Sequence, residues 1–292
     1  MEPGLTEALT AYDAVRPRLF GVAYRMLGSV AEAEDVLQDA WIRWQATDRS
    51  AVLEPAAFLM TMVTRLSING LTSARVRREA YVGPWLPEPV DTSADPTLGA
   101  ERAEALGLAV LLMLERLSPT ERAAYVLREA FAYPYDQISA IVQVSEPATR
   151  QLVSRARKHL AEGRRREVPV DEQRRLLSVF LTAARTGELH DLEQLLAEDV
   201  ASYSDGGGLV RASRFPVLGR TKVAKFIRAF QPHFWTGISL VEREFNGRPS
   251  TALVRDGSVV AVVNIDASED GIEQIQWMMS PQKLGLLAVG GA

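Results

Sequence analysis

One short segment of this acidic chain is strongly basic. Residues 150–166 carry seven lysines and arginines against one acid, Glu162, a local charge of +6, whereas the whole chain has a net charge of −4. Such a block can bind the phosphates of a nucleic acid, or it can be the solvated face of a helix. Charge alone does not separate these two interpretations.

The elements that position this block favour DNA binding. The pattern predicts a helix over residues 134–142, a tight turn at 143–145 and a longer helix over 146–161, which is the organisation of a helix-turn-helix. Upstream, the sequence SPTE at residues 118–121 combines an N-cap serine, a first-turn proline and a capping-box glutamate, so it predicts another helix start. Polar side chains of the longer helix that project from roughly one side can reach a major groove. They are Arg150, Ser154, Arg157 and Lys158.

A second group of side chains shares one face of a predicted helix near the N-terminus. Ser29 and Glu32 form a capping box that opens this helix. Four residues then follow at spacings of i, i+3, i+4 and i+7, so they form one exposed stripe that is mostly acidic or polar. They are Asp35, Gln38, Asp39 and Ile42. The pattern by itself favours an ordinary solvated face.

A third cluster lies toward the end of the next predicted helix, which runs from Pro55 to about Thr72. Such a cluster can hold phosphates, or it can complement the negative end of the helix dipole. Its members are Arg65, Asn69, Arg75, Arg77 and Arg78.

The chain changes character after this cluster. Residues 81–100 contain four prolines and predict a linker, although the large aromatic side chain of Trp85 is expected to lie against other groups. Beyond residue 166 the pattern predicts helices followed by an antiparallel meander, which is an α+β domain. The predicted helices cover residues 171–186, 192–196 and 222–230, and the strands cover residues 200–204, 238–245, 251–255, 258–265 and 272–279.

Composition excludes several classes of function. The chain has no cysteine and three histidines, which excludes disulfides and thiol chemistry and makes a metal site a weak expectation. The longest apolar run, residues 105–114, is about half of the roughly 20 residues that cross a bilayer, and no secretory signal is visible. We therefore expect a cytoplasmic protein with no membrane partner, no metal and no cofactor.

Three segments, taken in order, resemble a known family. Residues 33–41 (AEDVLQDAW) are similar to the helix by which bacterial sigma factors grip the clamp helices of RNA polymerase. Residues 117–122 (LSPTER) and 154–157 (SRAR) are similar to the sigma domain that binds the minus-thirty-five promoter element. Over about residues 10–163 the chain resembles the minimal, extracytoplasmic-function type of sigma factor.

The rest of the chain narrows the resemblance to one subgroup. The linker sequence WLPEP at residues 85–89, the turn DGGG at 205–208 and the last domain are similar to members that carry a C-terminal SnoaL-like domain of the nuclear-transport-factor-2-like fold. The resemblance implies a multidomain fold class, with two all-α sigma domains, the second containing the helix-turn-helix, followed by an α+β cone-shaped SnoaL-like domain. We expect sigma domain 2 at residues 8–80, the linker at 81–100, sigma domain 4 at 101–166 and the SnoaL-like domain at 167–292.

The resemblance also implies a role for each polar cluster, with core RNA polymerase and promoter DNA as partners. The acidic stripe would bind the polymerase clamp, and the arginine cluster would hold the minus-ten strand, where a base leaves the stack. The minus-thirty-five contacts would add Glu146 and Thr149 to the four side chains of the longer helix. The C-terminal domain would regulate the sigma factor from within the chain. Its expected contact joins Trp85 to the turn of Asp205, Gly206, Gly207 and Gly208, where glycines allow close backbone approach.

A few positions depart from the family pattern. The chain has SPQK at residues 280–283 where the family tends to have Asn-Pro-Asp-Lys. Gln143 occupies the helix-turn-helix turn where glycine is favoured, and Thr149 stands where an apolar residue is usual.

Two other classes of function compete with the sigma factor. One is a DNA-tethered sensor or an isomerase-like or cyclase-like enzyme, because the implied C-terminal fold commonly encloses an apolar cavity and leaves room for a small hydrophobic ligand. The other is a plain helix-turn-helix repressor, which would not need the acidic stripe. We expect no catalysis, since an Asp before three glycines is first a turn former. The catalytic candidates are His190, Asp199, Tyr203, Asp205, His233 and Asp266.

Overall fold

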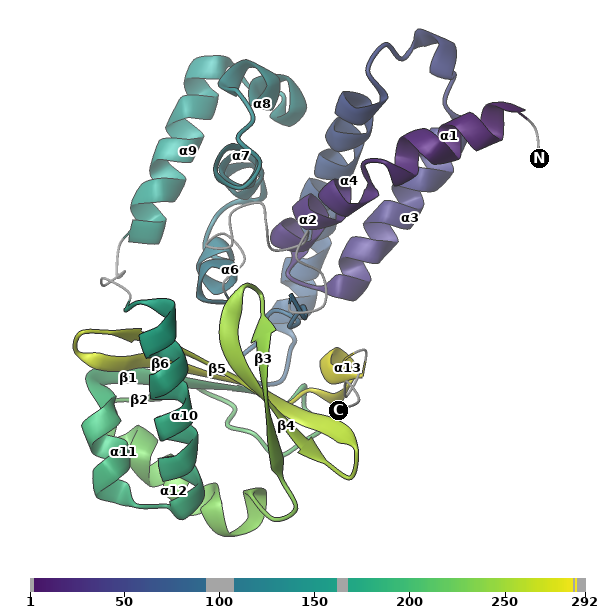
Figure 1. Ribbon diagram of the computed structural model, residues 1–292. Helices are drawn as coiled ribbons and strands as arrows, with labels where there is room; N and C mark the ends of the chain where they lie inside the picture. The colour runs from purple at the N-terminus through teal and green to yellow at the C-terminus, as the bar shows by residue number, and fades with distance from the viewer. Residues whose placement is uncertain (1–2, 93–107, 162–167, 286, 288–292) are drawn as a thin grey trace. The chain divides into compact units, whose positions relative to one another are not determined.

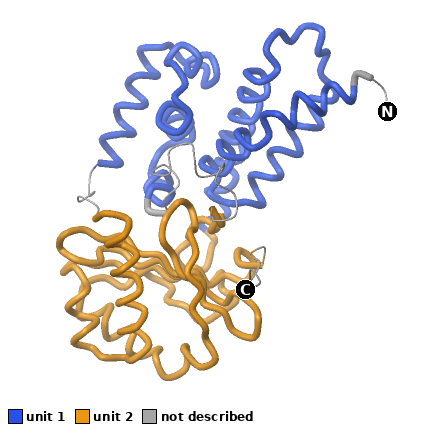
Figure 2. Tube along the Cα trace, in the orientation of Figure 1, with its two compact units in different colours: residues 1–79, 96–106, 110–162 blue, residues 80–95, 107–109, 163–292 orange. Residues whose placement is uncertain are grey.

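The computed structural model describes residues 3–92, 108–161, 168–285 and 287. The chain divides into two compact units, which Figure 2 shows in different colours. Unit 1 comprises residues 1–79, 96–106 and 110–162, and unit 2 comprises residues 80–95, 107–109 and 163–292. The described part of the predicted linker therefore clusters with the C-terminal unit.

The first part of unit 1 is a helical bundle built on the apolar faces of α2, α3 and α4 (Figure 1). Ser29 caps α3, because its hydroxyl oxygen accepts a hydrogen bond from the Glu32 N–H at 3.2 Å. The inner face of α3 includes Trp44, which is buried and donates its indole N–H to the Ala8 carbonyl at 3.0 Å. The elements are α1 (Pro3–Asp13), α2 (Arg16–Leu27), α3 (Val30–Ala46), a 3-10 turn (Arg49–Ala51) and α4 (Pro55–Glu79).

Helix α4 is longer than the sequence pattern predicted. The expected end near Thr72 is wrong, because the helix continues to Glu79. Its last turns are held by Ala74, which is buried, and by arginines that donate to carbonyl groups of neighbouring segments. The arginine cluster consequently lies along the helix itself.

The second part of unit 1 contains the predicted helix-turn-helix. A full capping box between Ser118 and Glu121 opens α7. Gln143 ends α8 in the left-handed conformation with φ 59°, so the turn has the backbone that favours glycine at a cost of about 1 kcal/mol for another residue. The elements are α6 (Leu108–Leu114), α7 (Pro119–Glu129), α8 (Tyr135–Val142) and α9 (Glu146–Ala161).

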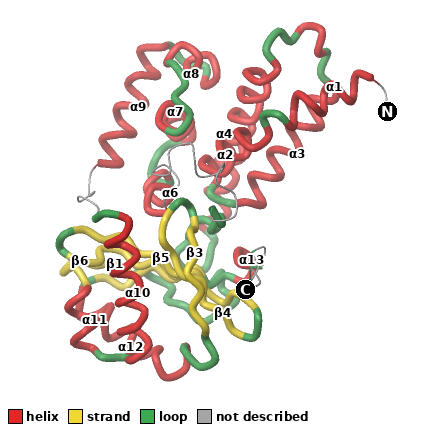
Figure 3. The backbone as a smooth tube through the Cα atoms, in the orientation of Figure 1, coloured by secondary structure: helices red, strands yellow, loops and turns green. Residues whose placement is uncertain are grey.

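Unit 2 is a six-stranded sheet in the order β2-β1-β6-β5-β4-β3, with helices packed on one face (Figure 3). Its core joins Phe180 and Ile227 of the helices to Leu253, Val263 and Ile275 of the sheet. The helices are α10 (Val170–Thr186), α11 (Leu189–Leu195), α12 (Arg220–Phe234) and α13 (Pro281–Leu284). The strands are β1 (Leu196–Asp205), β2 (Val217–Leu218), β3 (Ser239–Phe245), β4 (Arg248–Arg255), β5 (Ser258–Ser268) and β6 (Gly271–Met278).

The sheet differs from the predicted antiparallel meander in one respect. Strands β3 to β6 follow one another antiparallel, but β1 pairs with β6 in parallel. The short elements β2 and α13 were not predicted, because two and four residues are too few to show a period. Among the helices that the structure describes, none is long and apolar enough to cross a membrane.

Candidate functional site

The predicted stripe on α3 lies on the exposed face of that helix. Asp35 and Gln38 are exposed and Asp39 is half-buried, with both of its carboxylate oxygens bonded to Arg43 at 3.0 Å. Ile42 is 56% exposed although it is a large apolar side chain. An isoleucine presented beside carboxylates suits a partner surface that offers both apolar and basic groups.

The arginines of α4 bond to other parts of unit 1. Arg65 donates to the Ile141 and Ala140 carbonyls of α8 at 3.0 Å each. Arg75 donates to the Glu115 and Leu117 carbonyls near the end of α6. The structure therefore joins two of the predicted minus-ten residues to neutral backbone acceptors of the second helical part.

Two further arginines of the cluster form ion pairs. Arg77 pairs with Glu32, and Arg78 pairs with Glu115 and donates to the Leu27 carbonyl. Asn69 is exposed, and together with Arg65 it borders a pocket on α4 that also contains Phe58, Met62 and Leu66.

Glu115, whose side chain is 21% exposed, forms an ion pair with Arg122 in unit 1. Arg122 is fully buried and donates from Nε to the Arg25 carbonyl at 2.9 Å. Burial raises the pKa of Glu115, but the guanidinium groups of Arg122 and Arg78 lower it by a larger amount. The pKa of Glu115 therefore lies below its ordinary value. Glu115 therefore remains ionised and fixes the contact between the two helical parts.

Helix α9 presents the predicted basic face. The side chains of Arg150, Ser154, Arg157 and Lys158 are exposed. Arg150 pairs with Glu146 at 2.6 Å and lies 4.4 Å from the centre of the Tyr135 ring. Arg157 pairs with Glu129 at 2.7 Å, and this hydrogen bond raises the arginine's pKa above its ordinary value.

Thr149 does not belong to this exposed face. Its side chain is fully buried and its hydroxyl donates to the Ser145 carbonyl at 3.1 Å. The prediction that Thr149 contacts DNA is therefore wrong, because a buried side chain cannot reach a base or a phosphate. A threonine can stand at this usually apolar position because the helix backbone satisfies its hydroxyl.

A polar site in unit 2 surrounds the carboxylate of Asp205, which is fully buried. Its Oδ1 accepts hydrogen bonds from the Tyr81 hydroxyl at 2.6 Å and the Gly207 N–H at 3.1 Å. Its Oδ2 accepts from the Leu86 N–H at 2.8 Å and from Nζ of Lys283 at 2.7 Å. One carboxylate thus binds the linker at two points and the C-terminal helix α13 at a third.

Lys283 also binds the linker directly. Its ammonium group donates to the Leu86 carbonyl and lies 4.4 Å from the centre of the Trp85 ring and 5.0 Å from that of Tyr81. Burial, followed by the hydrogen bond to Asp205, raises the pKa of Tyr81 above its ordinary value, which keeps the phenol protonated as a donor.

The glycines after Asp205 allow the close approach that the sequence predicted. Gly207 has φ 61°, and a Cβ there would lie 2.7 Å from Oγ of Ser280 and 3.3 Å from the Tyr81 hydroxyl. Gly208 has φ 73°, and its Cβ would lie 3.1 Å from Cβ of Val82 in the linker. Side chains at these positions would separate the turn from the linker.

The linker is bound at a second place, the β3–β4 turn. Val90 donates its N–H to the Asn246 side chain at 3.1 Å and accepts from the Asn246 N–H at 2.9 Å. Thr92 donates its N–H to the Glu244 carbonyl at 2.9 Å. Residues 81–92 therefore lie along the C-terminal domain rather than free of it.

Sequence reasoning missed three members of this site, Tyr81, Asn246 and Lys283. A signal was present for Lys283, because the lysine is the one charged residue of the family's terminal motif that this chain keeps. Tyr81 and Asn246 gave no such signal, since their partners are 124 and 156 residues distant in sequence.

Comparisons with known proteins identify the family. The model of Sigma-70 region 2 matches residues 11–77, and the model of Sigma-70, region 4 matches residues 107–160. The ECF RNA polymerase sigma factor SigJ of Mycobacterium tuberculosis is 37% identical over 239 residues, which cover 79% of this chain and 75% of SigJ. This chain belongs to the extracytoplasmic-function (ECF) sigma factors. The probable ECF RNA polymerase sigma factor SigI of M. tuberculosis is 29% identical over 279 residues, covering 94% of this chain and 93% of SigI.

The likeness extends to the C-terminal domain. The crystal structure of M. tuberculosis SigJ matches this ECF sigma factor with a TM-score of 0.75 at 30% identity, over 95% of this chain and 98% of SigJ. The fold is therefore two all-α sigma domains followed by an α+β domain with a six-stranded mixed sheet, as in SigJ. As an ECF sigma factor the protein directs transcription initiation by RNA polymerase.

Proposed function

We propose that this ECF sigma factor acts in the cytoplasm on core RNA polymerase and promoter DNA, and that its C-terminal domain regulates it by binding the linker between the sigma domains. The observation that carries the regulatory part is the Asp205 carboxylate, which is fully buried and accepts hydrogen bonds from Tyr81, Leu86, Gly207 and Lys283. The proposal contains no catalytic step.

Polymerase binding is assigned to the α3 stripe. Its apolar member, Ile42, is 56% exposed in the free protein, and Asp35 and Gln38 are exposed beside it. Burial of the isoleucine side chain against a partner would remove its exposed apolar surface from water and so favour binding. The carboxylates would set the orientation of the two proteins.

Promoter binding is assigned to α9 and to α4. On α9, the exposed Arg150, Arg157 and Lys158 would neutralise phosphates and reach guanine edges at the minus-thirty-five element. On α4, Arg65 and Asn69 border a pocket that contains Phe58, a combination suited to an unstacked minus-ten base. DNA at α4 would compete with the carbonyls of α8 for Arg65.

Regulation is assigned to the linker because it joins α4 to α6. When residues 81–92 are bound to the C-terminal domain, a shorter stretch of chain remains to connect the two sigma domains. The length of a connecting segment sets how far two binding modules can separate and still bind together. Linker binding would therefore control whether both promoter elements can be reached at once.

Run-off transcription tests this proposal. Core RNA polymerase and a genomic promoter pool would be combined with the full chain, with a chain truncated after residue 167, and with the variants Trp85→Ala and Gly207→Val. We expect transcripts from the full or truncated chain, and an altered level in both variants. Gly257→Ala is the matched control, because Gly257 also has positive φ, 72°, but its Cβ would have no neighbour within 4 Å.

Each outcome bears on a separate part of the proposal. Absence of transcripts and of core binding in every form would refute the polymerase assignment. Unaltered transcription in the truncated chain and in both variants would refute regulation through the linker while leaving the sigma activity intact.

A further inference from the structure

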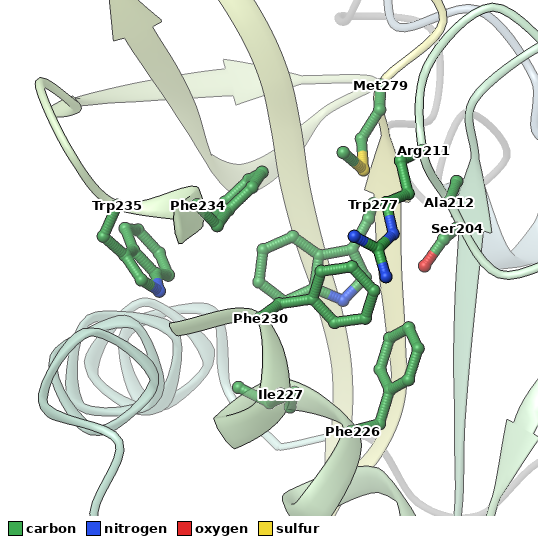
Figure 4. A pocket seen from close by; sticks show the side chains of 10 residues that line it. All are labelled: Ser204, Arg211, Ala212, Phe226, Ile227, Phe230, Phe234, Trp235, Trp277 and Met279. Atoms are coloured by element: carbon green, nitrogen blue, oxygen red, sulfur yellow. The ribbon is translucent and has the colours of Figure 1, made fainter. Parts of the chain in front are cut away.

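An aromatic pocket lies on the helix-covered face of the unit 2 sheet, between α12 and β6 (Figure 4). The Phe226 and Phe230 rings have centres 4.7 Å apart, and the Phe234 ring meets Trp277 edge to face at 6.0 Å. Flat aromatic walls suit a small ring compound, because two aromatic rings pack well face to face or edge to face.

The polar groups of the pocket are all able to donate hydrogen bonds. Trp277 is 7% exposed, and its buried indole N–H has no hydrogen-bond partner among the described residues. Arg211 brings its guanidinium to the pocket and lies 5.6 Å from the centre of the Phe230 ring. Ser204 stands beside Trp277 in the β1–β6 register and also lines the pocket. Leaving a buried donor unpaired is unfavourable, so the Trp277 N–H favours a ligand that supplies an acceptor.

Among the residues that the structure describes, no acid or histidine lines the pocket to supply that acceptor or to act as a base. Apart from the three residues named above, the lining residues are aromatic or apolar, and Trp235 adds a second indole N–H, which is also a donor. None of the six candidates for catalysis lines it. Tyr203 and Asp205 alternate with Ser204 along β1 and so belong to the opposite face of the sheet. The pocket therefore has the chemistry of a binding site for an anion with an apolar body.

We propose that this pocket binds a small single-ring aromatic carboxylate. The ring packs against Phe226, Phe230 and Trp277, and the carboxylate accepts hydrogen bonds from the Trp277 indole N–H and the Arg211 guanidinium. Both bonds are of the strong charge-assisted kind, because the acceptor is ionised.

The pocket adjoins the linker site along two strands, and this part rests on the proposed function. Ser204 lines the pocket while the next residue, Asp205, binds the linker. Met279 also lines the pocket, donates its N–H to the Asp205 carbonyl at 2.8 Å, and precedes α13, which carries Lys283. A ligand that moves the ends of β1 and β6 changes the linker site directly.

Nuclear magnetic resonance of the full chain tests the proposal with benzoate as the probe and benzyl alcohol as its uncharged analogue. We expect saturable benzoate binding that shifts the indole N–H signal of Trp277, assigned by its loss in Trp277→Phe. Trp277→Phe and Arg211→Gln should each weaken benzoate binding by about tenfold or more, the value of a lost charge-assisted hydrogen bond. Arg214→Gln is the matched control, because Arg214 is exposed nearby but does not line the pocket.

Several results would overturn the site. They are benzyl alcohol binding as tightly as benzoate, undiminished benzoate binding in Arg211→Gln, and no saturable shift at millimolar benzoate. Arg211→Gln keeps the test valid if Trp277→Phe fails to fold, because Arg211 is exposed. Hydrogen exchange of the Leu86 amide without benzoate reports linker binding separately, so failure of the pocket is distinguishable from failure of the proposed function. An unchanged Leu86 exchange rate with benzoate bound would refute the coupling.

Discussion

Asp205→Asn tests the linker site with a change that preserves the shape of the side chain. The asparagine has one acceptor oxygen, whereas the carboxylate accepts from Tyr81, Gly207, Leu86 and Lys283. The amide also leaves the Lys283 ammonium without its counter-charge in a site where the lysine side chain is 8% exposed. We expect the linker to dissociate from the C-terminal domain much more often.

The magnitude follows from the burial of the ion pair. Removing one partner of a buried pair costs about 3–5 kcal/mol, because the other charge stays desolvated. A loss of about 3 kcal/mol lowers the docking equilibrium by about 100-fold or more. The Leu86 N–H donates to Asp205 at 2.8 Å, so its hydrogen exchange, followed by mass spectrometry, should accelerate by a similar factor.

Two further variants make this test specific. Asp256→Asn is the control, because Asp256 is an exposed turn residue with φ 50° and asparagine tolerates that backbone. Lys283→Met combined with Asp205→Asn should cost less than the sum of the single variants, because the double variant leaves no unpaired charge. The same Leu86 exchange rate in Asp205→Asn as in the unchanged chain would refute the role of the carboxylate.

The other predictions concern separate parts of the molecule. Gly207→Val should raise Leu86 exchange, because its side chain would overlap Ser280 Oγ at 2.7 Å. Ile42→Ala should weaken core polymerase binding in a titration while changing stability by less than about 0.5 kcal/mol, since the side chain is 56% exposed. The pKa of Glu115 is lowered in the folded protein, so its ionised carboxylate stabilises the fold at pH values above its ordinary pKa of 4.5. This stabilisation is lost as the pH falls through the folded-state pKa. Glu115→Gln should therefore abolish this acid dependence of the thermal unfolding temperature. Arg65→Ala should reduce the slope of log promoter affinity against log salt concentration by about one, the value for one lost phosphate contact.

Each of these predictions has a control variant, a contradicting result, or both. For Gly207→Val the control is Gly257→Ala, and equal Leu86 exchange in the two would contradict steric overlap. For Ile42→Ala the control is Leu53→Ala, since Leu53 is 92% exposed and lies outside the stripe. If Glu115→Gln keeps the acid dependence of unfolding, that dependence belongs to another carboxylate. If Arg65→Ala leaves the salt dependence of promoter binding unchanged, Arg65 does not contact DNA.

The sequence predicted those features that depend on local period and capping. Ser29 and Ser118 cap the helices that they were expected to cap, and Leu152, Val153 and Ala156 form the buried side of α9. Such features are local because helix faces repeat over three or four residues. The approach of the Asp205 turn to the linker was predicted from the family resemblance, and its glycines explain why that approach is sterically allowed.

The remaining features depend on partners that side-chain patterns do not encode. Arg65 and Arg75 donate to backbone carbonyls, and a carbonyl is present at every residue, so no sequence pattern singles out Ile141 or Leu117 as the acceptor. Threonine is usually a surface residue, but the Thr149 hydroxyl donates to a carbonyl of its own helix, so the side chain can be buried. The parallel pairing of β1 with β6 similarly joins residues 73 to 76 positions apart in the sequence, beyond the reach of any local pattern.

The different partners of the α4 arginines suggest different fates on promoter DNA. Arg65 and Arg75 bond to neutral carbonyls, and a phosphate is the stronger acceptor because it is ionised. Exchange of a carbonyl for a phosphate therefore favours the DNA-bound state. Arg78 is paired with Glu115, which also holds the fully buried Arg122, so moving Arg78 to a phosphate would leave that network with one cation fewer. We therefore propose that DNA binding at α4 depends on Arg65 and Arg75, and that Arg78 stabilises unit 1.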